Sequence, residues 1–245
     1  MNEPKISIIT VSYNSVSTIA ETIEHVLNQT YDNFDYTIID GLSSDGTVKL
    51  AESYREKFAE RNISYKIISE KDNGIYDAMN KGIAATDGDI VGIINSDDYY
   101  NYDALEKVAT FYDKTNFDIM YADLRIFGGK KEYIKHSKLG KKFKTRQWNH
   151  PTTFVTRKVY NETRYACESI YDDLNFMLSA KRKGFRICVL NEVLANFRLG
   201  GVSNKKSWKQ CKARIKLRNK IYKDNGCRGY RLDNFITEFV KYILS

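Results

Sequence analysis

The first half of the chain alternates short apolar runs, rich in β-branched residues, with segments of helical periodicity. Strands that alternate with helices imply βαβ units, whose strands pair in parallel through right-handed crossovers. We therefore expect a Rossmann-like α/β sheet over residues 1–123. The expected strands are 5–12, 36–39, 63–68, 89–95 and 118–121, and the expected helices lie near 19–27, 45–58, 75–85 and 104–112.

The second half follows a different pattern. We expect a hairpin, a short strand, a helix ended by Gly184 in a left-handed cap, two more strands and, after Ser203, two helices. The ranges before Ser203 are 124–135, 154–155, 172–183, 186–190 and 193–198. We interpret residues 1–203 as one α/β domain with halves 1–123 and 124–203, and residues 204–245 as a basic amphipathic helical tail.

The net charge of +8 is concentrated in this tail. Residues 205–231 hold eleven Lys and Arg against the lone Asp224, whereas residues 1–204 are nearly neutral. Such asymmetry suggests a polyanionic partner, either an anionic membrane or a nucleic acid. A basic helix with an apolar face over 235–244 can lie on an anionic leaflet. It can equally pack on the domain with its cationic side in water, and both interpretations stay open.

Neither end of the sequence shows a targeting or membrane-spanning pattern. No run reaches the roughly 18 apolar residues that a spanning helix needs, and the first residues lack the form of a signal peptide. The four cysteines are far apart without a C-x-x-C spacing, so a structural zinc site is not expected. We expect a cytosolic protein.

Polar side chains follow the first four expected strands where each strand ends. In an open parallel sheet, ligands bind outside the carboxyl ends of the strands. Turns are polar in any case, which could explain one such end, but an Asp at three of them favours a binding crevice. The four ends read Ser12-Tyr13-Asn14, Asp40-Gly41, Glu70 to Gly74, and Asn95-Ser96-Asp97-Asp98.

The adjacent carboxylates of Asp97 and Asp98 indicate a cation. Two such groups repel each other unless they are solvated, protonated or bridged by a metal ion. Oxygen ligands alone fit Mg²⁺ or Mn²⁺ better than zinc, particularly when diphosphate oxygens complete the shell. The sequence has no Walker-type loop, and no G-x-G-x-x-G follows the first strand. A diphosphate held by a metal ion rather than by a glycine loop remains.

Several ordered motifs together resemble a known family. The runs SIITVSYN, IIDGLSSDGT, SEKDNGIYDAMNKGI and GDIVGIINSDD resemble the nucleotide-binding half of the family 2 inverting glycosyltransferases, which have the GT-A fold. The resemblance continues through NHPTTF, YDDLNFML and NEVLANFRLGGVS, so that it covers residues 5–203.

This resemblance implies roles for the residues at the strand ends. Asp40 would accept a hydrogen bond from the base, and Asp97 would bind the metal ion, with Asp98 as a second ligand. Asn95 replaces the leading Asp of the family's D-x-D motif, which leaves the ribose contact in doubt. The implied nucleotide-binding residues are Thr10, Ser12, Tyr13, Asp40, Lys71, Asp72, Asn95 and Ser96.

In the second half, the resemblance implies that Asp173 is the catalytic base. Its neighbour Asp172 would cap the helix or be solvated. His150 would face the metal ion or the acceptor, or serve only as a structural residue. Arg198 would lie near the diphosphate, and Gly200-Gly201 would form either a loop over the donor or a plain turn.

The implied reaction transfers a sugar, with inversion, from a nucleotide-sugar to a hydroxyl acceptor with the help of Mn²⁺ or Mg²⁺. We expect a UDP-sugar donor and a polyprenyl-diphosphate-linked glycan acceptor, handled by an enzyme that lies on the inner face of the cell membrane. A non-catalytic nucleotide or carbohydrate binder of the same fold is the alternative. A nucleic-acid partner is not expected, because the predicted crevice is acidic.

Overall fold

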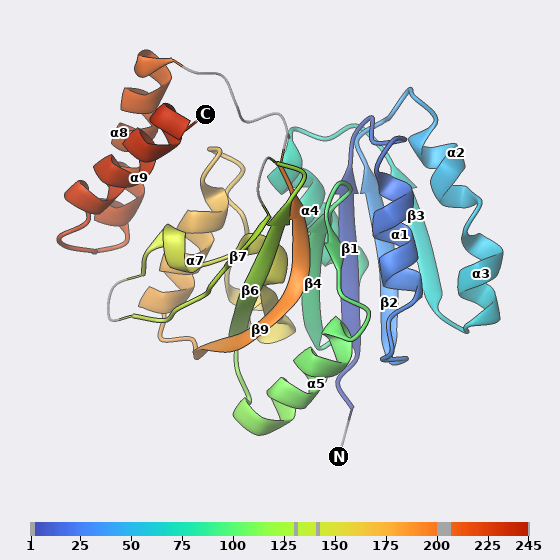
Figure 1. The fold of residues 1–245 in the computed structure, drawn as a ribbon. Coiled ribbons are helices and arrows are strands. Elements are labelled where there is room, and N and C mark those ends of the chain that lie inside the picture. The colour runs from blue at the N-terminus through green and yellow to red at the C-terminus, as the bar shows by residue number, and fades with distance from the viewer. Residues whose placement is uncertain (1–2, 130–131, 141–142, 200–206, 245) are drawn as a thin grey trace.

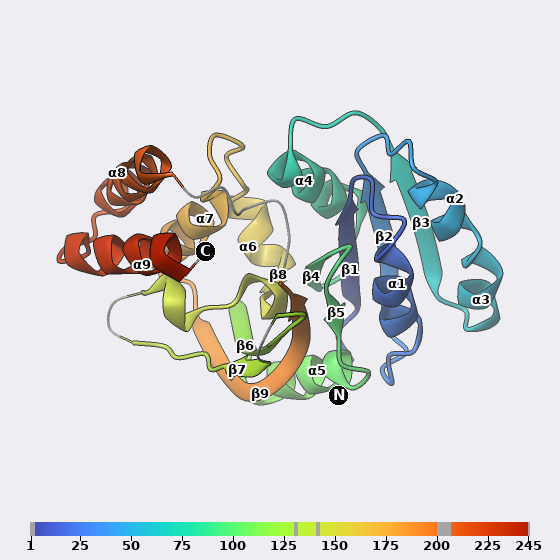
Figure 2. The same ribbon diagram turned by 45° about the horizontal axis from the view of Figure 1, so that its top comes forward.

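The computed structural model describes residues 3–129, 132–140, 143–199 and 207–244. A single sheet runs through the centre of the molecule, with helices on both faces (Figure 1). Its strands lie in the order β3-β2-β1-β4-β8-β6-β9-β5, and β7 pairs with the outer part of β6. The sheet is mainly parallel and curls towards its β9 end (Figure 2).

The first four strands confirm the predicted parallel half. They pair in parallel throughout, so that their carboxyl ends meet at one edge, the top of Figure 1. This edge is called the carboxyl edge below. The strands are β1 (Ile6–Ser12), β2 (Phe34–Asp40), β3 (Ser64–Ser69) and β4 (Ile90–Asn95).

The remaining strands extend the sheet beyond β4. Next to β4 lies the antiparallel β8 (Phe154–Thr156), followed by β6 (Ile119–Phe127) and β9 (Ile187–Arg198), which are parallel to each other. The predicted hairpin is confirmed by the pairing of β6 with β7 (Tyr133–Lys135). A two-residue strand, β5 (Tyr99–Tyr100), pairs with β9 and was not expected.

The core has two layers, one on each face of the sheet. Along β1, Ile6 and Ile8 pack on one face, whereas Ile9 and Val11 pack on the other. This explains why the sequence of β1 is apolar without alternation. The first face is covered by α1 (Ile19–Leu27), α2 (Thr47–Glu52), α3 (Arg55–Glu60) and α5 (Ala104–Thr115), and the second by α4 (Ile75–Ala85), α6 (Arg157–Glu162) and α7 (Asp172–Arg182).

Two predictions about these elements were wrong. The helix expected over 45–58 is divided into α2 and α3, and Asp45 precedes α2 without being its N-cap residue. Instead, the Asp45 carboxylate accepts the N–H groups of Thr47 at 3.0 Å and Val16 at 3.1 Å, so that it joins two loops. The strands expected at 186–190 and 193–198 form one strand, β9, with an irregular register near its middle.

The tail forms two helices, α8 (Trp208–Asp224) and α9 (Arg231–Leu244), that pack on each other and, through α8, on α7. Tyr222 donates a hydrogen bond to the carbonyl of Phe143 at 3.1 Å, and Asn225 donates to Asn175 on α7 at 2.9 Å. The tail helices therefore pack on the α/β domain. Among the described residues, no helix has both the length and the apolar character needed to cross a membrane.

Candidate functional site

The loops that follow β1 and β2 lie side by side at the carboxyl edge of the sheet. Together they form a surface that is called the wall below. Asn14 has a left-handed backbone with φ of 48°. Its N–H donates to the Ser43 hydroxyl at 2.8 Å, and its side-chain oxygen accepts the N–H of Ser44 at 2.9 Å. Together with the bonds of Asp45, these contacts fasten the two loops to each other. The wall is therefore formed before any ligand binds.

Asp40 supports this wall from behind. Its carboxylate is fully buried and accepts hydrogen bonds from the Ser43 N–H at 2.9 Å and the Ser69 hydroxyl at 2.8 Å. The Ser12 hydroxyl donates to it at 3.4 Å. Thr10 is also fully buried, and its hydroxyl accepts a bond from Tyr36 at 2.9 Å. Asp40 and Thr10 thus both lie behind the surface of the wall, and their roles towards a nucleoside stay predictions.

The outer part of the wall consists of the exposed Tyr13 and the partly buried Gly41 and Asp72. Tyr13 is 66% exposed, and its ring lies beside Gly41. A Cβ atom on Gly41 would lie 2.6 Å from Asp72 Oδ2 and 3.4 Å from Tyr13 Cδ2. An aromatic ring on which a base can stack therefore lies near a carboxylate that can accept from it. Neighbouring Lys71 is exposed.

If a nucleotide base stacks on Tyr13 beside Asp72, replacing Gly41 by Ala should weaken nucleotide binding. The added methyl group must displace the Asp72 carboxylate, so that this carboxylate can no longer accept a hydrogen bond from the base. Loss of such a hydrogen bond costs about 1–3 kcal/mol, which raises Kd roughly 10-fold or more. Calorimetric titration of UDP in the presence of Mn²⁺ measures the effect. Thermal melting serves as the control for folding, and an unchanged Kd would show that the base binds elsewhere.

The acidic pair lies at the end of β4. Asp98 is fully buried, and its Oδ1 accepts the backbone N–H of Arg198 at 2.9 Å. Burial, reinforced by the charge of Asp97, raises the pKa of Asp98 to about 7. Burial also raises the pKa of the half-buried Asp97. Both shifts show that the site disfavours negative charge unless a cation is present.

The residues present fit a hard divalent cation. Among the described residues, Asp98 Oδ2 and Asn95 Oδ1 are buried oxygens without a hydrogen-bond partner. The part of the chain that is described offers no cluster of three or more His, Cys, Asp or Glu able to hold a metal ion. A cation beside Asp97 and Asp98 would therefore take its other ligands from diphosphate oxygens and water, as is usual for Mg²⁺. Ser96 is turned towards the wall, where it donates to the Ser15 hydroxyl at 2.7 Å.

Arg198 has a favourable electrostatic interaction with both carboxylates of the acidic pair. Its guanidinium lies 4.6 Å from the ring centre of Phe127 and pairs with Glu21 on α1. Its Nε is buried without a partner among the described residues. The predicted loop residues Gly200 and Gly201 lie outside the described residues.

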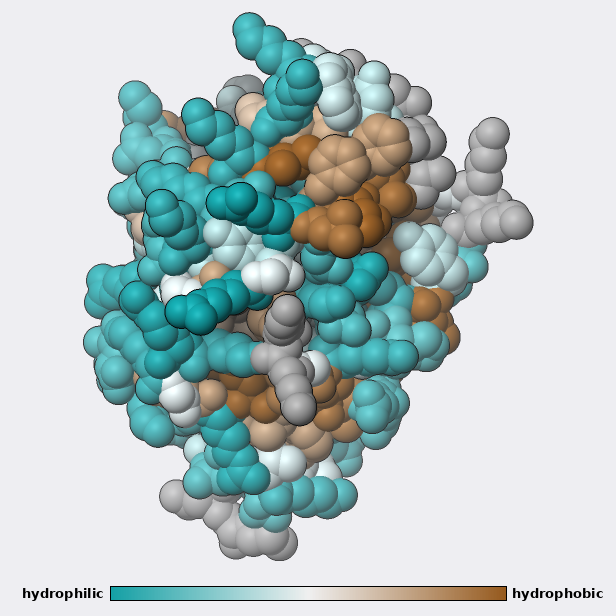
Figure 3. Space-filling view, turned by 90° about the vertical axis from the view of Figure 1, so that its left-hand side faces the viewer, coloured by the Kyte–Doolittle hydropathy of each residue, from teal (hydrophilic) through white to brown (hydrophobic). Residues whose placement is uncertain are grey.

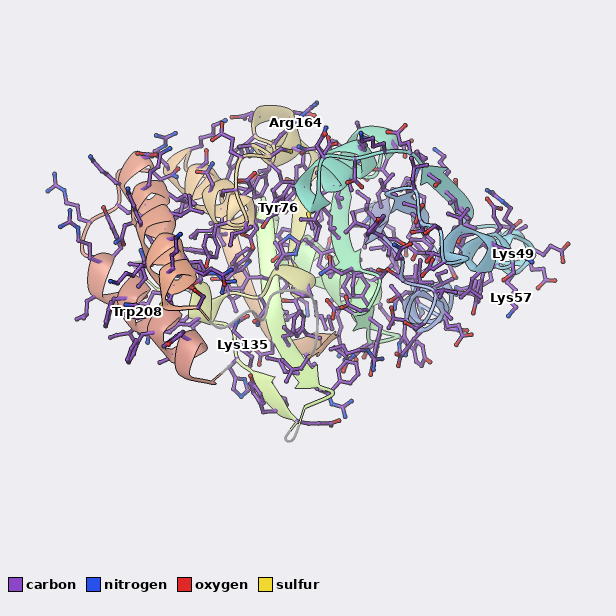
Figure 4. All side chains as sticks on the ribbon, turned by 90° about the horizontal axis from the view of Figure 1, so that it is seen from above. Lys49, Lys57, Tyr76, Lys135, Arg164 and Trp208 are labelled. Atoms are coloured by element: carbon purple, nitrogen blue, oxygen red, sulfur yellow. The ribbon has the colours of Figure 1, made fainter. Side chains whose placement is uncertain are left out.

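Asp173 also lies at the carboxyl edge. It stands in the first turn of α7, which begins at this edge, and β9 then starts from the opposite edge. Tyr76, from the first turn of α4, lies between α4 and α7 near the middle of the molecule (Figure 4). Burial raises the pKa of Tyr76, and the charge of Asp173 adds to the shift. Burial lowers the pKa of His150, although the charge of Asp173 opposes this. Asp173 is thus accompanied by a neutral imidazole and a neutral phenol.

The other predicted residues of this half have structural contacts. The Asp172 carboxylate is buried and accepts the Glu168 N–H at 2.8 Å and the Ser169 hydroxyl at 2.9 Å, so that it pins the preceding loop. The ring Nε2 of His150 lies 3.4 Å from the Tyr165 hydroxyl. His150 thus contacts Tyr165 and interacts electrostatically with Asp173, and its role towards a metal ion or an acceptor stays a prediction.

Sequence reasoning missed Tyr76 and Gly41. Tyr76 lies inside the motif SEKDNGIYDAMNKGI, which was noticed as a whole without weighing this residue. Gly41 follows Asp40 directly, and only the close approach of Asp72 in the structure shows why a residue without a side chain stands there.

The chain is similar to known proteins in sequence and in fold. The family model described as Glycosyl transferase family 2 matches residues 7–170. The chain belongs to this family. It is 29% identical over 222 residues to the putative teichuronic acid biosynthesis glycosyltransferase TuaG of Bacillus subtilis, covering 86% of this chain and 85% of TuaG.

Two solved structures share the GT-A fold of this family 2 glycosyltransferase. The crystal structure of S. aureus TarS 1-349 with UDP-GlcNAc matches with a TM-score of 0.72 at 18% identity, over 97% of this chain and 73% of that one. The mannosyltransferase PcManGT from Pyrobaculum calidifontis, in complex with GDP-Man and Mn²⁺, matches with a TM-score of 0.71 at 14% identity, over 100% of this chain and 71% of that one. The expected fold is thereby confirmed.

Proposed function

We propose that this glycosyltransferase transfers a sugar from a UDP-sugar, with inversion, to a hydroxyl group of a polyprenyl-diphosphate-linked glycan. The observation that carries this proposal is the position of Asp173 on the same sheet edge as Asp97 and Asp98. A proton acceptor and a site for a leaving diphosphate would then lie at the same edge of the sheet. Residues 1–203 would be the catalytic domain, and the tail would place it on the inner face of the membrane.

The donor would bind along the wall with its base on Tyr13 and near Asp72. Lys71 and the amide of Asn95 would border the ribose and diphosphate. The complex of TarS with UDP-GlcNAc supports a UDP-sugar as the donor class. Mn²⁺ or Mg²⁺, held by Asp97 and Asp98, would supply positive charge that stabilises the departing diphosphate, and the Mn²⁺ complex of PcManGT supports this choice.

Asp173 would take the proton from the acceptor hydroxyl. The acceptor oxygen then forms a bond to the anomeric carbon while the bond from that carbon to the diphosphate oxygen breaks, and UDP leaves. A single displacement inverts the anomeric configuration. His150 stays neutral beside Asp173, which avoids a competing ion pair with the base. Arg198 would face the charge of the diphosphate.

Two observations support the acceptor class. TuaG, which is similar over most of its length, carries a name from teichuronic acid biosynthesis, and this supports an acceptor from surface-polysaccharide assembly. The basic tail supports an acceptor that is anchored in a membrane.

A screen of UDP-sugars with a polyprenyl-diphosphate-linked GlcNAc analogue tests the proposal. We expect UDP release that requires both Mn²⁺ and the acceptor, and a product whose anomeric configuration is opposite to that of the donor by nuclear magnetic resonance. Tight Mn²⁺-dependent UDP binding without release from any UDP-sugar would instead identify a non-catalytic binder. Retained configuration would refute the single displacement.

A further inference from the structure

Helix α9 buries its polar side and exposes its apolar side. Asn234 and Glu238 are buried against α8, where Glu238 pairs with Arg218 at 3.0 Å and both side chains are only 1% exposed. Arg218 also donates to Asn234 at 3.3 Å. The outward side is apolar, with exposures of 37 to 71%. It is called the apolar row and consists of Leu232, Phe235, Ile236, Phe239 and Val240.

Trp208 extends the apolar row from α8. Its ring centre lies 6.2 Å from that of Phe239 and 5.6 Å from that of Tyr242, and 40% of the residue is exposed. Figure 3 turns this side of the molecule to the viewer and shows a compact brown patch at the upper right among teal residues. A contiguous exposed patch of this kind marks an interaction surface.

A row of lysines runs along the exposed side of α8, next to the apolar row. The spacing of three or four residues places all of them on one face of the helix. The ammonium group of Lys212 lies 5.3 Å from the centre of the Trp208 ring, so the lysine row reaches the apolar row through Trp208. The lysine row consists of Lys209, Lys212, Lys216, Lys220 and Lys223, all exposed.

We propose that α8 and α9 dock on the surface of an anionic phospholipid bilayer. The apolar row and Trp208 would enter the boundary between headgroups and acyl chains, and the lysine row would face the lipid phosphates. Charge favours lipid over a second copy of the chain. A symmetric pair would bury the apolar rows but bring two lysine rows together.

Arg218, which binds the polar side of α9, also connects the two tail helices to the segment before α7. The guanidinium of Arg218 lies 5.5 Å from the ring centre of Tyr171, and it donates to the Thr145 hydroxyl at 2.5 Å. Tyr171 immediately precedes α7, on which Asp173 lies. Docking would therefore hold α7 and Asp173 at a fixed place relative to the lipid. This deepens the proposed function, since it names the surface that brings the enzyme to a lipid-linked acceptor.

Flotation of the full chain with vesicles tests the docking without donor or metal ion. Vesicles of phosphatidylcholine mixed with phosphatidylglycerol should carry the protein, whereas pure phosphatidylcholine should carry far less. The triple variant Lys212→Gln, Lys216→Gln, Lys220→Gln should lower the partition coefficient roughly 100-fold. The double variant Phe235→Ser, Phe239→Ser should lower it by at least about 10-fold.

The matched control is Lys49→Gln with Lys57→Gln, which removes two exposed charges at the end of the molecule opposite Trp208 (Figure 4). Its partition should equal that of the parent chain. Equal binding to both vesicle types, or an unchanged triple variant, would overturn the proposal. The proposal would also be overturned if the parent chain did not bind vesicles but formed a dimer in sedimentation velocity that the Phe variant abolished.

The two proposals can fail separately. Circular dichroism and UDP binding show whether each variant is folded, and the lysine variant alters only exposed side chains. Sugar transfer to a short soluble acceptor without vesicle binding would refute the docking alone. Vesicle binding without UDP release from any UDP-sugar would refute the transferase reaction alone.

Discussion

Asp173→Asn should lower kcat by roughly 10² to 10⁴-fold, the usual contribution of a general base, while the Kd for UDP stays unchanged. Asn cannot take the proton of the acceptor hydroxyl, yet it keeps the size of the side chain and can keep the contact near Tyr76. The proposed base lies on α7, whereas the wall that would hold the nucleoside belongs to the loops after β1, β2 and β3. Chemistry and donor binding should therefore separate.

Acceptor-dependent UDP release and calorimetric titration of UDP measure the two effects. Asp113→Asn on α5 removes an exposed carboxylate elsewhere and should leave both quantities unchanged. If Asp173→Asn turned over within about threefold of the parent chain, another group would have to be the base. A parallel loss of UDP affinity would mean that Asp173 supports the donor site.

Asp98→Asn should abolish Mn²⁺-dependent UDP binding and, at the same time, stabilise the metal-free fold above neutral pH. Asn retains one carbonyl oxygen but loses the charge that attracts the dication, and we expect roughly a 100-fold or greater loss in kcat/KM. UDP binding measured in chelator should change little. A variant that kept the full Mn²⁺ dependence would show that Asp98 is not a ligand.

The stability effect follows from the raised pKa of Asp98. Its folded-state pKa of about 7 lies above the value of about 3.9 of an unfolded Asp, so the unfolded chain releases this proton first as the pH rises. Stability is therefore lost between about pH 4 and about pH 7, by about 1.4 kcal/mol or less per pH unit. The melting temperature in chelator, compared at about pH 5 and about pH 8, should fall less for Asp98→Asn. Equal falls would contradict the linkage.

The parallel half of the fold could be predicted because its signals are local. Strands buried on both faces read as unbroken apolar runs, and parallel strands bring all their carboxyl ends to one edge. That rule predicts from the sequence that Tyr13, Asp72 and Asp97 lie at one edge of the sheet. The acidic pair after β4 was visible for the same reason.

Contacts between distant residues could not be predicted in this way. The sequence shows that Asp40 ends a strand, but not that Ser43 and Ser69 donate hydrogen bonds to it, and Ser69 is 29 residues away in the chain. In α9, periodicity showed an apolar face without its direction. The direction is set by Arg218, whose partner Glu238 lies on the opposite side of that helix.

The hydrogen bonds between the loops after β1 and β2 have a consequence for how a nucleotide arrives. Because Asn14, Ser43 and Asp45 already hold these loops together, little backbone entropy remains to be lost when a base enters. Association should then approach lock-and-key behaviour, and amide hydrogen exchange in residues 13–16 and 43–47 should be nearly as slow in the ligand-free protein as in the saturated complex.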